Sequence, residues 1–330
     1  MSMGTEERTD DPGVPTEATV EADRRKPPVR LGDRIFSTMS IGSGVLILVV
    51  LVLVAAFLFR EALPYFTDNT AIEREVPFTE YVWPLVFGTV YAASLALLFA
   101  VIPAIAVALF ISHYAPKAIA RTLGTVIDLL AAIPSVVYGL WGIFVLAPLL
   151  ARSVFPFLED HFGFLPFFGG PTASSGRTML TAAVVLAVMI LPIITAISRE
   201  VFLQVPRLHE EAALALGATR WEVIKLAVLP YSRSAIISGS MLGLGRALGE
   251  TMAIAIILSP TDGLVSLNTI STQNSQTIAA HIALAYPEST GLEVNRLFAA
   301  GLVLFAITLF VNVVARRITN SRADFSGANG

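Results

Sequence analysis

The sequence predicts an all-α membrane protein with six transmembrane helices and with both termini in the cytoplasm. Of its 330 residues, 55% are hydrophobic and 14% are charged, whereas soluble domains carry about 25% charged residues. The apolar residues gather in runs long enough to cross a hydrocarbon core of about 30 Å. Lysine and arginine are also distributed unevenly between successive connecting segments. These observations indicate a chain whose solvent is the bilayer.

Six apolar runs define the expected spans. They cover residues 41–59, part of 82–110, 126–150, 179–197, 234–258 and 297–315. The first run is longer, and lies further from the N-terminus, than a secretory signal of about 7–15 apolar residues, so it predicts an uncleaved helix. Prolines lie within the second, third and fourth runs, and the third is expected to be interrupted by Pro134 and Pro148. Such prolines are compatible with spanning helices, because neighbouring helices can satisfy the freed carbonyl groups.

The distribution of positive charge predicts the orientation. With the N-terminus inside, the segments expected in the cytoplasm hold sixteen lysine and arginine residues, and those expected outside hold five. One further cation, Arg246, falls inside the fifth run. Because cytoplasmic loops carry the excess of positive charge, both termini are expected in the cytoplasm. The outside loops are then expected at residues 61–81, 151–177 and 260–292.

The chain divides into four expected parts. Residues 1–33 are polar and lack an apolar period, so they predict a disordered cytoplasmic tail. Residues 34–81 hold the first transmembrane helix and its outside loop. Residues 82–316 form a five-span core that includes a long cytoplasmic loop at 206–230, and residues 317–330 form a second cytoplasmic tail.

Several classes of site are excluded by residues that the chain lacks. It has no cysteine, which excludes disulfides, thiolate metal sites and a cysteine nucleophile. Its four histidines do not cluster in the sequence, so a histidine metal site is not expected. No Walker A pattern is present, so the chain is not expected to bind ATP through a P-loop. We therefore expect no metal, no cofactor bound by this chain and no catalytic residues.

The cytoplasmic loop at 206–230 is predicted to form two short helices. Pro206 suits the first turn of a helix, and Gly217 can end that helix in a left-handed turn. Thr219 followed by Glu222 is a capping-box pattern that begins a second helix. Pro230 is expected to end or kink this second helix before the fifth span. The apolar faces of the two helices could also lie on lipid headgroups, which is the alternative interpretation.

The same loop resembles the EAA motif of ABC importer permeases. The matching residues are Glu211, Ala212, Ala213, Gly217, Leu229 and Pro230. In that family the motif docks into a groove on the cytoplasmic ATPase, so the resemblance implies that these residues couple the chain to an ATPase. Ala227 departs from the pattern, because the family often has a larger aliphatic residue there.

The fifth run contains the two ionisable residues Arg246 and Glu250. They are four residues apart, so on a continuous helix they share one face and can pair. Charges at this depth cost at least about 2.5–3.5 kcal/mol each, and they usually face a bundle interior or a water-filled path. Arg246 is a candidate donor to a passing oxyanion, with Glu250 holding it in place. The alternative is a buried ion pair that merely locks helices together.

Two span segments carry a more specific resemblance. Residues 129–142, LLAAIPSVVYGLWG, and residues 243–256, GLGRALGETMAIAI, resemble the C-type permease subunit of phosphate-specific ABC importers. The resemblance implies the six-helix, MetI-like fold of type I ABC importer permeases, with residues 82–316 as the common core. It also implies a non-catalytic subunit in a bacterial plasma membrane, in contact with membrane lipid.

The same resemblance implies the partners. They are a second six-span permease of the A type, a cytoplasmic pair of ABC ATPase subunits that hydrolyse ATP, and an extracytoplasmic phosphate-binding protein. Phosphate is the expected substrate, and no nucleic-acid partner is expected.

The chemistry of the residues leaves alternatives open. A buried arginine indicates an anion, and phosphate comes from the resemblance alone. A permease for sulfate, molybdate or a phosphonate is therefore the main alternative. A secondary anion transporter would not need the EAA loop, and an intramembrane enzyme would need a polar catalytic cluster shared by several spans. Arg177 and Arg296 border outside loops and are further candidates for receiving an anion.

Overall fold

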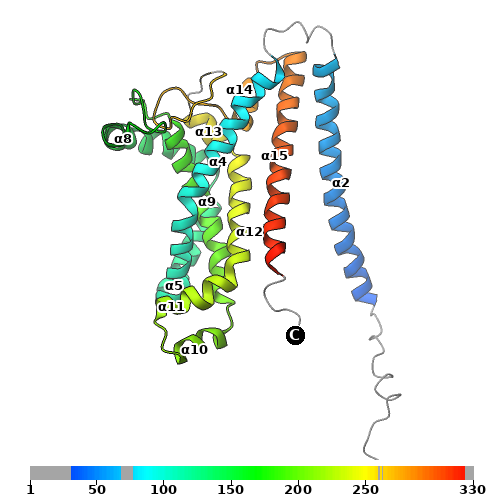
Figure 1. Cartoon of the computed structure of the whole chain (residues 1–330). Coiled ribbons are helices and arrows are strands. Elements are labelled where there is room, and N and C mark those ends of the chain that lie inside the picture. The colour runs from blue at the N-terminus through cyan, green and yellow to red at the C-terminus, as the bar shows by residue number, and fades with distance from the viewer. Residues whose placement is uncertain (1–30, 68–76, 259–260, 262, 324–330) are drawn as a thin grey trace, which may run out of the picture. The chain divides into compact units, whose positions relative to one another are not determined.

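The computed structural model describes residues 31–67, 77–258, 261 and 263–323, and its described elements are helices, several of which include short π turns (Figure 1). The expected N-terminal tail at 1–33 lies outside the described residues apart from its last three positions. The last residues of the expected C-terminal tail, 324–330, lie outside them as well. Helix α15 (Leu292–Ala323) continues seven residues beyond the expected core boundary at 316, so part of the expected tail is helical.

The chain separates into two compact units, residues 1–54 and 55–330. Helix α2 (Leu31–Thr67) begins in the first unit and ends in the second. In the first unit the described part of α2 is mostly apolar from Ile41 to Val54, which agrees with the expected first span. Within the described residues, five helices are long and apolar enough to cross a membrane: Arg34–Thr67, Phe78–Tyr114, Ser135–Phe162, Met179–Leu203 and Leu292–Arg317.

In the second unit, α9 (Met179–Leu203) forms the centre of the bundle. It packs against α4 (Phe78–Leu109), α12 (Leu229–Leu248) and α5 (Lys117–Ala131). The contact between α4 and α9 is close because α4 carries a row of fully buried alanines at a spacing of four residues: Ala92, Ala96, Ala100, Ala104 and Ala108. Small side chains let helix backbones approach, which is how helices associate where no water drives them together.

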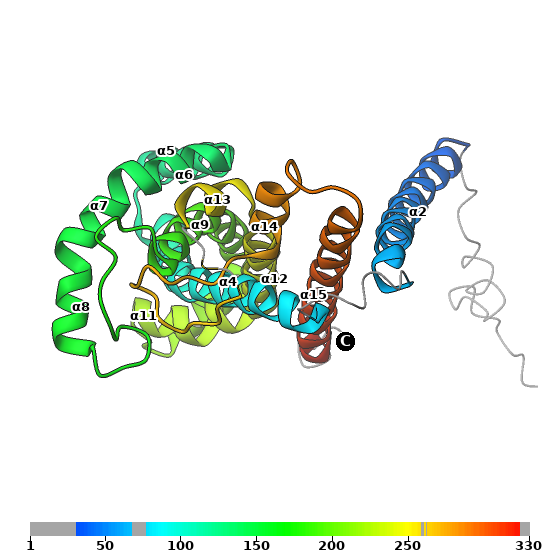
Figure 2. The same ribbon diagram turned by 90° about the horizontal axis from the view of Figure 1, so that it is seen from above.

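The expected third span, 126–150, was wrong at both ends. Helix α5 ends at Ala131, and α6 (Ser135–Trp141) begins after Pro134. Proline disfavours helical backbone at the residue before it, which explains the break. The new helix then runs on through residue 162, into the expected outside loop. Its parts are η2 (Gly142–Leu146), α7 (Ala147–Leu149), η3 (Leu150–Val154) and α8 (Phe155–Phe162). Figure 2 shows α5 to α8 along the outside of the bundle.

Of the two outcomes expected at Pro230, a stop or a kink, the stop was wrong. Helix α10 (Arg207–Ala215) is followed by α11 (Arg220–Val223), η4 (Ile224–Val228) and α12, with no non-helical residue between Arg220 and Leu248. The N–H of Leu229 donates to the carbonyl of Ile224, which closes the π turn. Pro230 lies directly after this π turn inside the continuous run, and prolines and π turns are both places where helices kink.

The expected fifth span, 234–258, is interrupted. Helix α12 ends at Leu248, residues 249–251 are not helical, and α13 (Met252–Ile257) begins after them. A non-helical segment then leads to α14 (Ile278–Ala285) and α15. Helices α10 and α11 lie at one end of the bundle and α8, α13 and α14 at the other (Figure 1). We call these the α10 end and the α14 end.

Candidate functional site

Arg246 lines a cavity of about 590 Å³. Four helices, α5, α9, α12 and α15, contribute the lining: Ala131, Ile193, Met241, Leu242, Gly245, Arg246, Thr308 and Asn312. Arg246 is half-buried in the last turn of α12. It is the charged residue of this lining, and Thr308 and Asn312 are the polar neighbours. A cavity with one permanent cation and two neutral polar side chains can bind a small anion.

The expected pairing of Arg246 with Glu250 was wrong. Within the part of the chain that the structure describes, no ion pair joins the two side chains. The reason is the break after Leu248, which removes the helical geometry on which the four-residue spacing depended. Glu250 is instead buried, and its Oε1 accepts a hydrogen bond from the N–H of Ala253 at 3.1 Å. The carboxylate therefore sits at the beginning of α13.

The glycines of α12 serve two different surfaces. A Cβ on Gly239 would lie 3.1 Å from Ile197, and a Cβ on Gly243 would lie 3.1 Å from Ile194, both on α9. These two glycines therefore allow the close approach of α12 and α9. No atom lies within 4 Å of a Cβ built on Gly245, which borders the Arg246 cavity. One side of α12 thus packs, and the neighbouring side opens to the cavity.

Arg177 is not placed to receive an anion in the Arg246 cavity. Its Nη2 donates to the carbonyl oxygens of Ile256 at 3.3 Å and of Leu258 at 3.2 Å. These carbonyls belong to the C-terminal end of α13, where a cation compensates the helix dipole. No sequence pattern predicts this contact, because the partners are backbone atoms some 80 residues further on.

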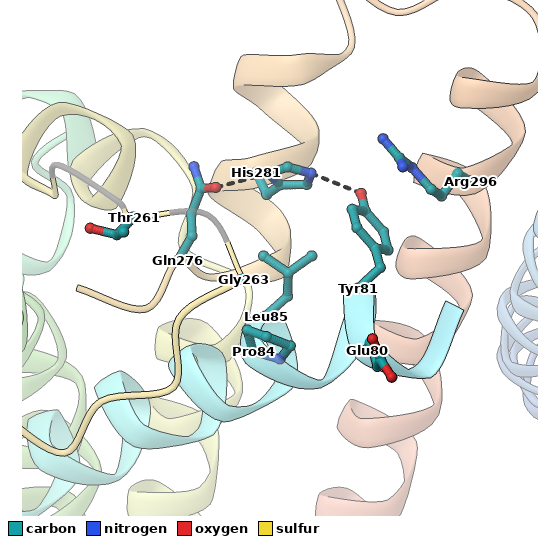
Figure 3. A pocket seen from close by; sticks show the side chains of 9 residues that line it. All are labelled: Glu80, Tyr81, Pro84, Leu85, Thr261, Gly263, Gln276, His281 and Arg296. Carbon is teal, nitrogen blue, oxygen red and sulfur yellow. Dashed lines mark hydrogen bonds between the residues drawn. The ribbon is translucent and has the colours of Figure 1, made fainter. Parts of the chain in front are cut away.

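Arg296 lines a separate pocket of about 380 Å³ at the α14 end (Figure 3). Its guanidinium lies 4.3 Å from the centre of the Tyr81 ring. The hydroxyl of Tyr81 is 2.8 Å from Nε2 of His281, and Nδ1 of His281 is 2.8 Å from Oε1 of Gln276. This row of polar contacts joins α4, α14 and the segment before α14. Arg246 and Arg296 therefore belong to different pockets.

The α10 end carries the residues that match the EAA motif. Gly217 has a positive φ of 85°. Its N–H donates to the carbonyl of Leu214, and the N–H of Ala218 donates to the carbonyl of Ala213. This is a Schellman turn, as the sequence predicted. Glu211 and Ala212 are exposed on α10, Ala213 is half-buried, and Leu229 and Pro230 open α12. The motif therefore holds both an exposed helix and the first residues of α12.

The predicted capping box is present in α11. The N–H of Thr219 donates to Glu222 at 2.7 Å, and the N–H of Glu222 donates to the hydroxyl of Thr219 at 3.4 Å. The bond from the backbone of Thr219, and then the bond from its hydroxyl, lower the pKa of Glu222 from its ordinary value. The carboxylate form is therefore favoured in the folded loop.

One contact between the loop and the core was missed by sequence reasoning. Nε2 of His113, in η1 (Phe110–Tyr114), lies 3.7 Å from Oε1 of Glu210. Glu210 precedes the EAA glutamate by one position. Two lone residues about a hundred positions apart give no pattern in a single sequence, so no signal could have found this pair.

Large apolar side chains stay exposed around the loop. Leu208 is 74% exposed, Leu216 is 90% exposed and Trp221 is 52% exposed. They lie on α10, on its C-terminal cap and on α11. Exposed apolar groups of this size at one end of a bundle indicate a surface that another molecule covers.

Comparison with known proteins agrees with this arrangement. Residues 104–322 match the family model of binding-protein-dependent transport system inner membrane components. The chain is 42% identical over 323 residues to phosphate transport system permease protein PstC 2 of Mycobacterium tuberculosis, covering 93% of this chain and 97% of the relative. It is 39% identical over 297 residues to phosphate transport system permease protein PstC of Mesorhizobium japonicum, covering 87% and 89%.

Solved structures show the same fold at low identity. A bacterial ABC transporter that imports the acidic polysaccharide alginate matches with a TM-score of 0.57 at 19% identity, covering 88% of this chain and 99% of that chain. The MetNI methionine ABC transporter, in an inward-facing conformation, matches with a TM-score of 0.51 at 14% identity, covering 72% and 96%. These likenesses establish the fold of an ABC importer permease.

Proposed function

Because the chain belongs to the family of binding-protein-dependent transport system inner membrane components, we propose that it is a permease subunit of an ATP-driven phosphate importer. The relatives that cover most of its length carry the name of phosphate permeases, and the half-buried Arg246 supplies a cation suited to an oxyanion. The chain itself contributes no catalytic group, and the ATP is hydrolysed by partner subunits.

The helical run from Arg220 to Leu248 carries this proposal. It joins the EAA loop directly to Arg246, along a helical path of about 40 Å at 1.5 Å per residue. A displacement of the loop therefore moves the Arg246 side chain in the cavity, because no non-helical segment lies between them. This is the mechanical link that an ATP-driven permease needs between its ATPase and its substrate.

The exposed face of the loop is the surface that we assign to the ATPase. Its apolar side chains Leu208, Leu216 and Trp221 can enter a groove, and Glu211 is exposed to take a basic partner. A lipid surface is the alternative for the same apolar groups. Closure of the ATPase pair on ATP would push α10 and α11, and the rigid run would pass that motion to the cavity.

The transport cycle that follows is alternating access. A phosphate-binding protein docks at the α14 end, which we place outside the cell, and the α10 end faces the cytoplasm. Phosphate then passes a path lined by Arg246, with Glu250 close by along the chain. In this proposal a second, A-type permease completes the path from the other side of the Arg246 cavity.

The topology belongs to the same proposal. We propose six spans, with α12 and α13 together forming the fifth, and with both termini in the cytoplasm of a bacterial cell. Residues 34–81 form the first span and its outer loop, and residues 82–316 form the permease core with its loop at 206–230. The interrupted fifth span resembles the broken helices that other transporters place at their substrate sites.

The test is uptake of labelled phosphate and labelled sulfate by phosphate-starved cells that lack the gene and any second phosphate importer. Wild type should restore phosphate uptake alone, and Arg246→Gln should not restore it. Arg152→Gln is the control, because Arg152 is an exposed arginine away from the cavity. Restored sulfate uptake would make the protein a permease for another oxyanion. Full phosphate uptake by Arg246→Gln would remove that residue from the path.

A further inference from the structure

Helix α13 is a short helix whose two ends are held by opposite charges. At its beginning, the Glu250 carboxylate accepts the N–H of Ala253 at 3.1 Å. At its end, the Arg177 guanidinium donates to the carbonyls of Ile256 and Leu258. Helix ends leave donors and acceptors unpaired, and charges of these signs at these ends stabilise them.

Arg177 also belongs to a group of hydrogen bonds that fixes the α14 end. Its carbonyl accepts a bond from Nδ2 of Asn274 at 3.0 Å, and Oδ1 of the same Asn274 accepts the N–H of Met179, the first residue of α9, at 3.0 Å. Arg177 therefore ties the end of α13 to the beginning of α9, the most buried helix of the bundle.

The two halves of the interrupted span thus have different attachments. Helix α12, with Arg246, packs on α9 through Gly239 and Gly243, and it is continuous with the EAA loop. Helix α13, with Glu250 at its beginning, is attached to α9 through Arg177. Residues 249–251 lie between the halves and are not helical. A motion of the loop can change the position of Arg246 relative to Glu250, provided that α13 stays in place.

We propose that Arg177 is a positioning residue for the anion path: it holds α13, and with it the Glu250 carboxylate, against α9 while α12 and Arg246 move. The inference rests on the proposed function of Arg246. Separation of the two charges leaves the cation available to an anion, as in this structure. If residues 249–251 become helical, Arg246 and Glu250 lie one turn apart on the same face of a continuous helix. They then pair, and the anion is released.

The first test is a double-mutant cycle on phosphate uptake with Arg177→Gln and Glu250→Gln. Arg177→Gln should lower the maximal rate about tenfold, the effect of a lost charged hydrogen bond, and leave the half-saturating phosphate concentration unchanged. Arg177→Lys should recover most of the rate, because an ammonium can still donate to both carbonyls. In a Glu250→Gln background, Arg177→Gln should have little further effect. Independent, multiplying effects would overturn the proposal.

The second test measures the position of α13 without transport, so it stands even where phosphate is not the substrate. The chain has no cysteine, so spin labels can be placed at Val188→Cys on α9 and Met252→Cys on α13, both partly exposed. The distance distribution in the purified chain should be narrow in wild type, Arg177→Lys and the Arg152→Gln control, and broad in Arg177→Gln. An unchanged distribution in Arg177→Gln would overturn the proposal.

Discussion

The two ends of the bundle are built in different ways. At the α14 end, buried polar side chains bond to backbone groups of other segments, beside a few exposed aromatic side chains such as Phe164. At the α10 end, large apolar side chains remain exposed, and the loop is held to the core by few contacts. The difference indicates that the α14 end keeps its shape through the cycle, whereas the α10 end takes its shape together with a partner.

The α14 end illustrates how a membrane protein satisfies irregular backbone. The N–H of Leu180 donates to the carbonyl of Thr269 at 2.8 Å, and the hydroxyl of Thr269 donates to the carbonyl of Phe167 at 2.9 Å. The N–H of Ile278 donates to the hydroxyl of Thr89 at 2.9 Å. Such backbone is tolerated at membrane depth where protein covers it. These contacts account for the polar side chains between residues 266 and 277.

The α10 end has the opposite character. Apart from local caps, it is joined to α4 and η1 by the His113–Glu210 pair and by a small apolar cluster that includes Phe202, Ile224 and Val228. Its large apolar side chains Leu208, Leu216 and Trp221 stay exposed. Four predictions, in decreasing order of expected effect, test this contrast between the ends.

The largest effect is expected at Asn274, which is 1% exposed. Asn274→Ala removes the acceptor of the Met179 N–H and the donor to the Arg177 carbonyl, leaving buried groups unpaired. We expect a loss of about 2–4 kcal/mol of stability, since each such group costs about 1–3 kcal/mol. Thermal unfolding of the purified protein measures it, with the exposed neighbour Gln273→Ala as the control. Equal unfolding temperatures for the two variants would contradict a self-contained α14 end.

The next effect is expected at Gly217, whose left-handed backbone costs about 1–2 kcal/mol for a residue with a side chain. A Cβ there would meet no atom within 4 Å, so the effect of Gly217→Val is purely one of backbone strain. We expect reduced phosphate uptake with more ATP hydrolysed per phosphate, and normal membrane insertion.

Two variants control this prediction. Gly217→Asn should recover most of the uptake, because asparagine tolerates left-handed backbone. Gly44→Val makes the same change in a helix with open space around it and should be neutral. Wild-type coupling in Gly217→Val would show that the turn does not set the shape of the docking surface.

A smaller effect is expected for the contact between the loop and the core. His113→Ala removes the pair with Glu210 at 3.7 Å. Because the pair is partly exposed, we expect less than about 1 kcal/mol and a modest fall in coupling. ATP hydrolysed per phosphate imported is the measurement, and His161→Ala, on α8 at the other end of the bundle, is the matched control. A complete loss of coupling would mean that the His113–Glu210 contact within the chain, and not a partner, sets the conformation of the α10 end.

The smallest effect concerns pH and the capping box. Because Thr219 lowers the pKa of Glu222 in the folded loop, the box contributes stability above the unfolded pKa of about 4.3. That contribution is lost as the pH falls through the lowered folded value. Fluorescence of Trp221, in a chain with Trp83→Phe and Trp141→Phe, should change in this acidic range. Glu222→Gln should remove the transition, and an identical transition in that variant would assign it to another group.

How much the sequence could predict depended on the range of the interaction. The caps at Gly217 and Thr219 were predicted correctly, because each depends on neighbours within a few residues. The interruption at Pro134 was expected from the proline, whereas the break after Leu248 was missed, because the apolar run continues across it. The spacing of Arg246 and Glu250 was read as a pair, which holds only on an unbroken helix.

The sequence by itself therefore determined the membrane setting, the all-α class, the coupling-loop turns and the family, since each of these is recorded in composition, local spacing or motif. Tertiary structure alone decided which backbone groups Glu250 and Arg177 bond to and how Asn274 joins segments at the α14 end. It also decided that the loop runs into α12 without a non-helical break. The physical reason is that these contacts join backbone carbonyls and N–H groups of distant segments. Every residue carries such groups, so a sequence does not show which of them meet.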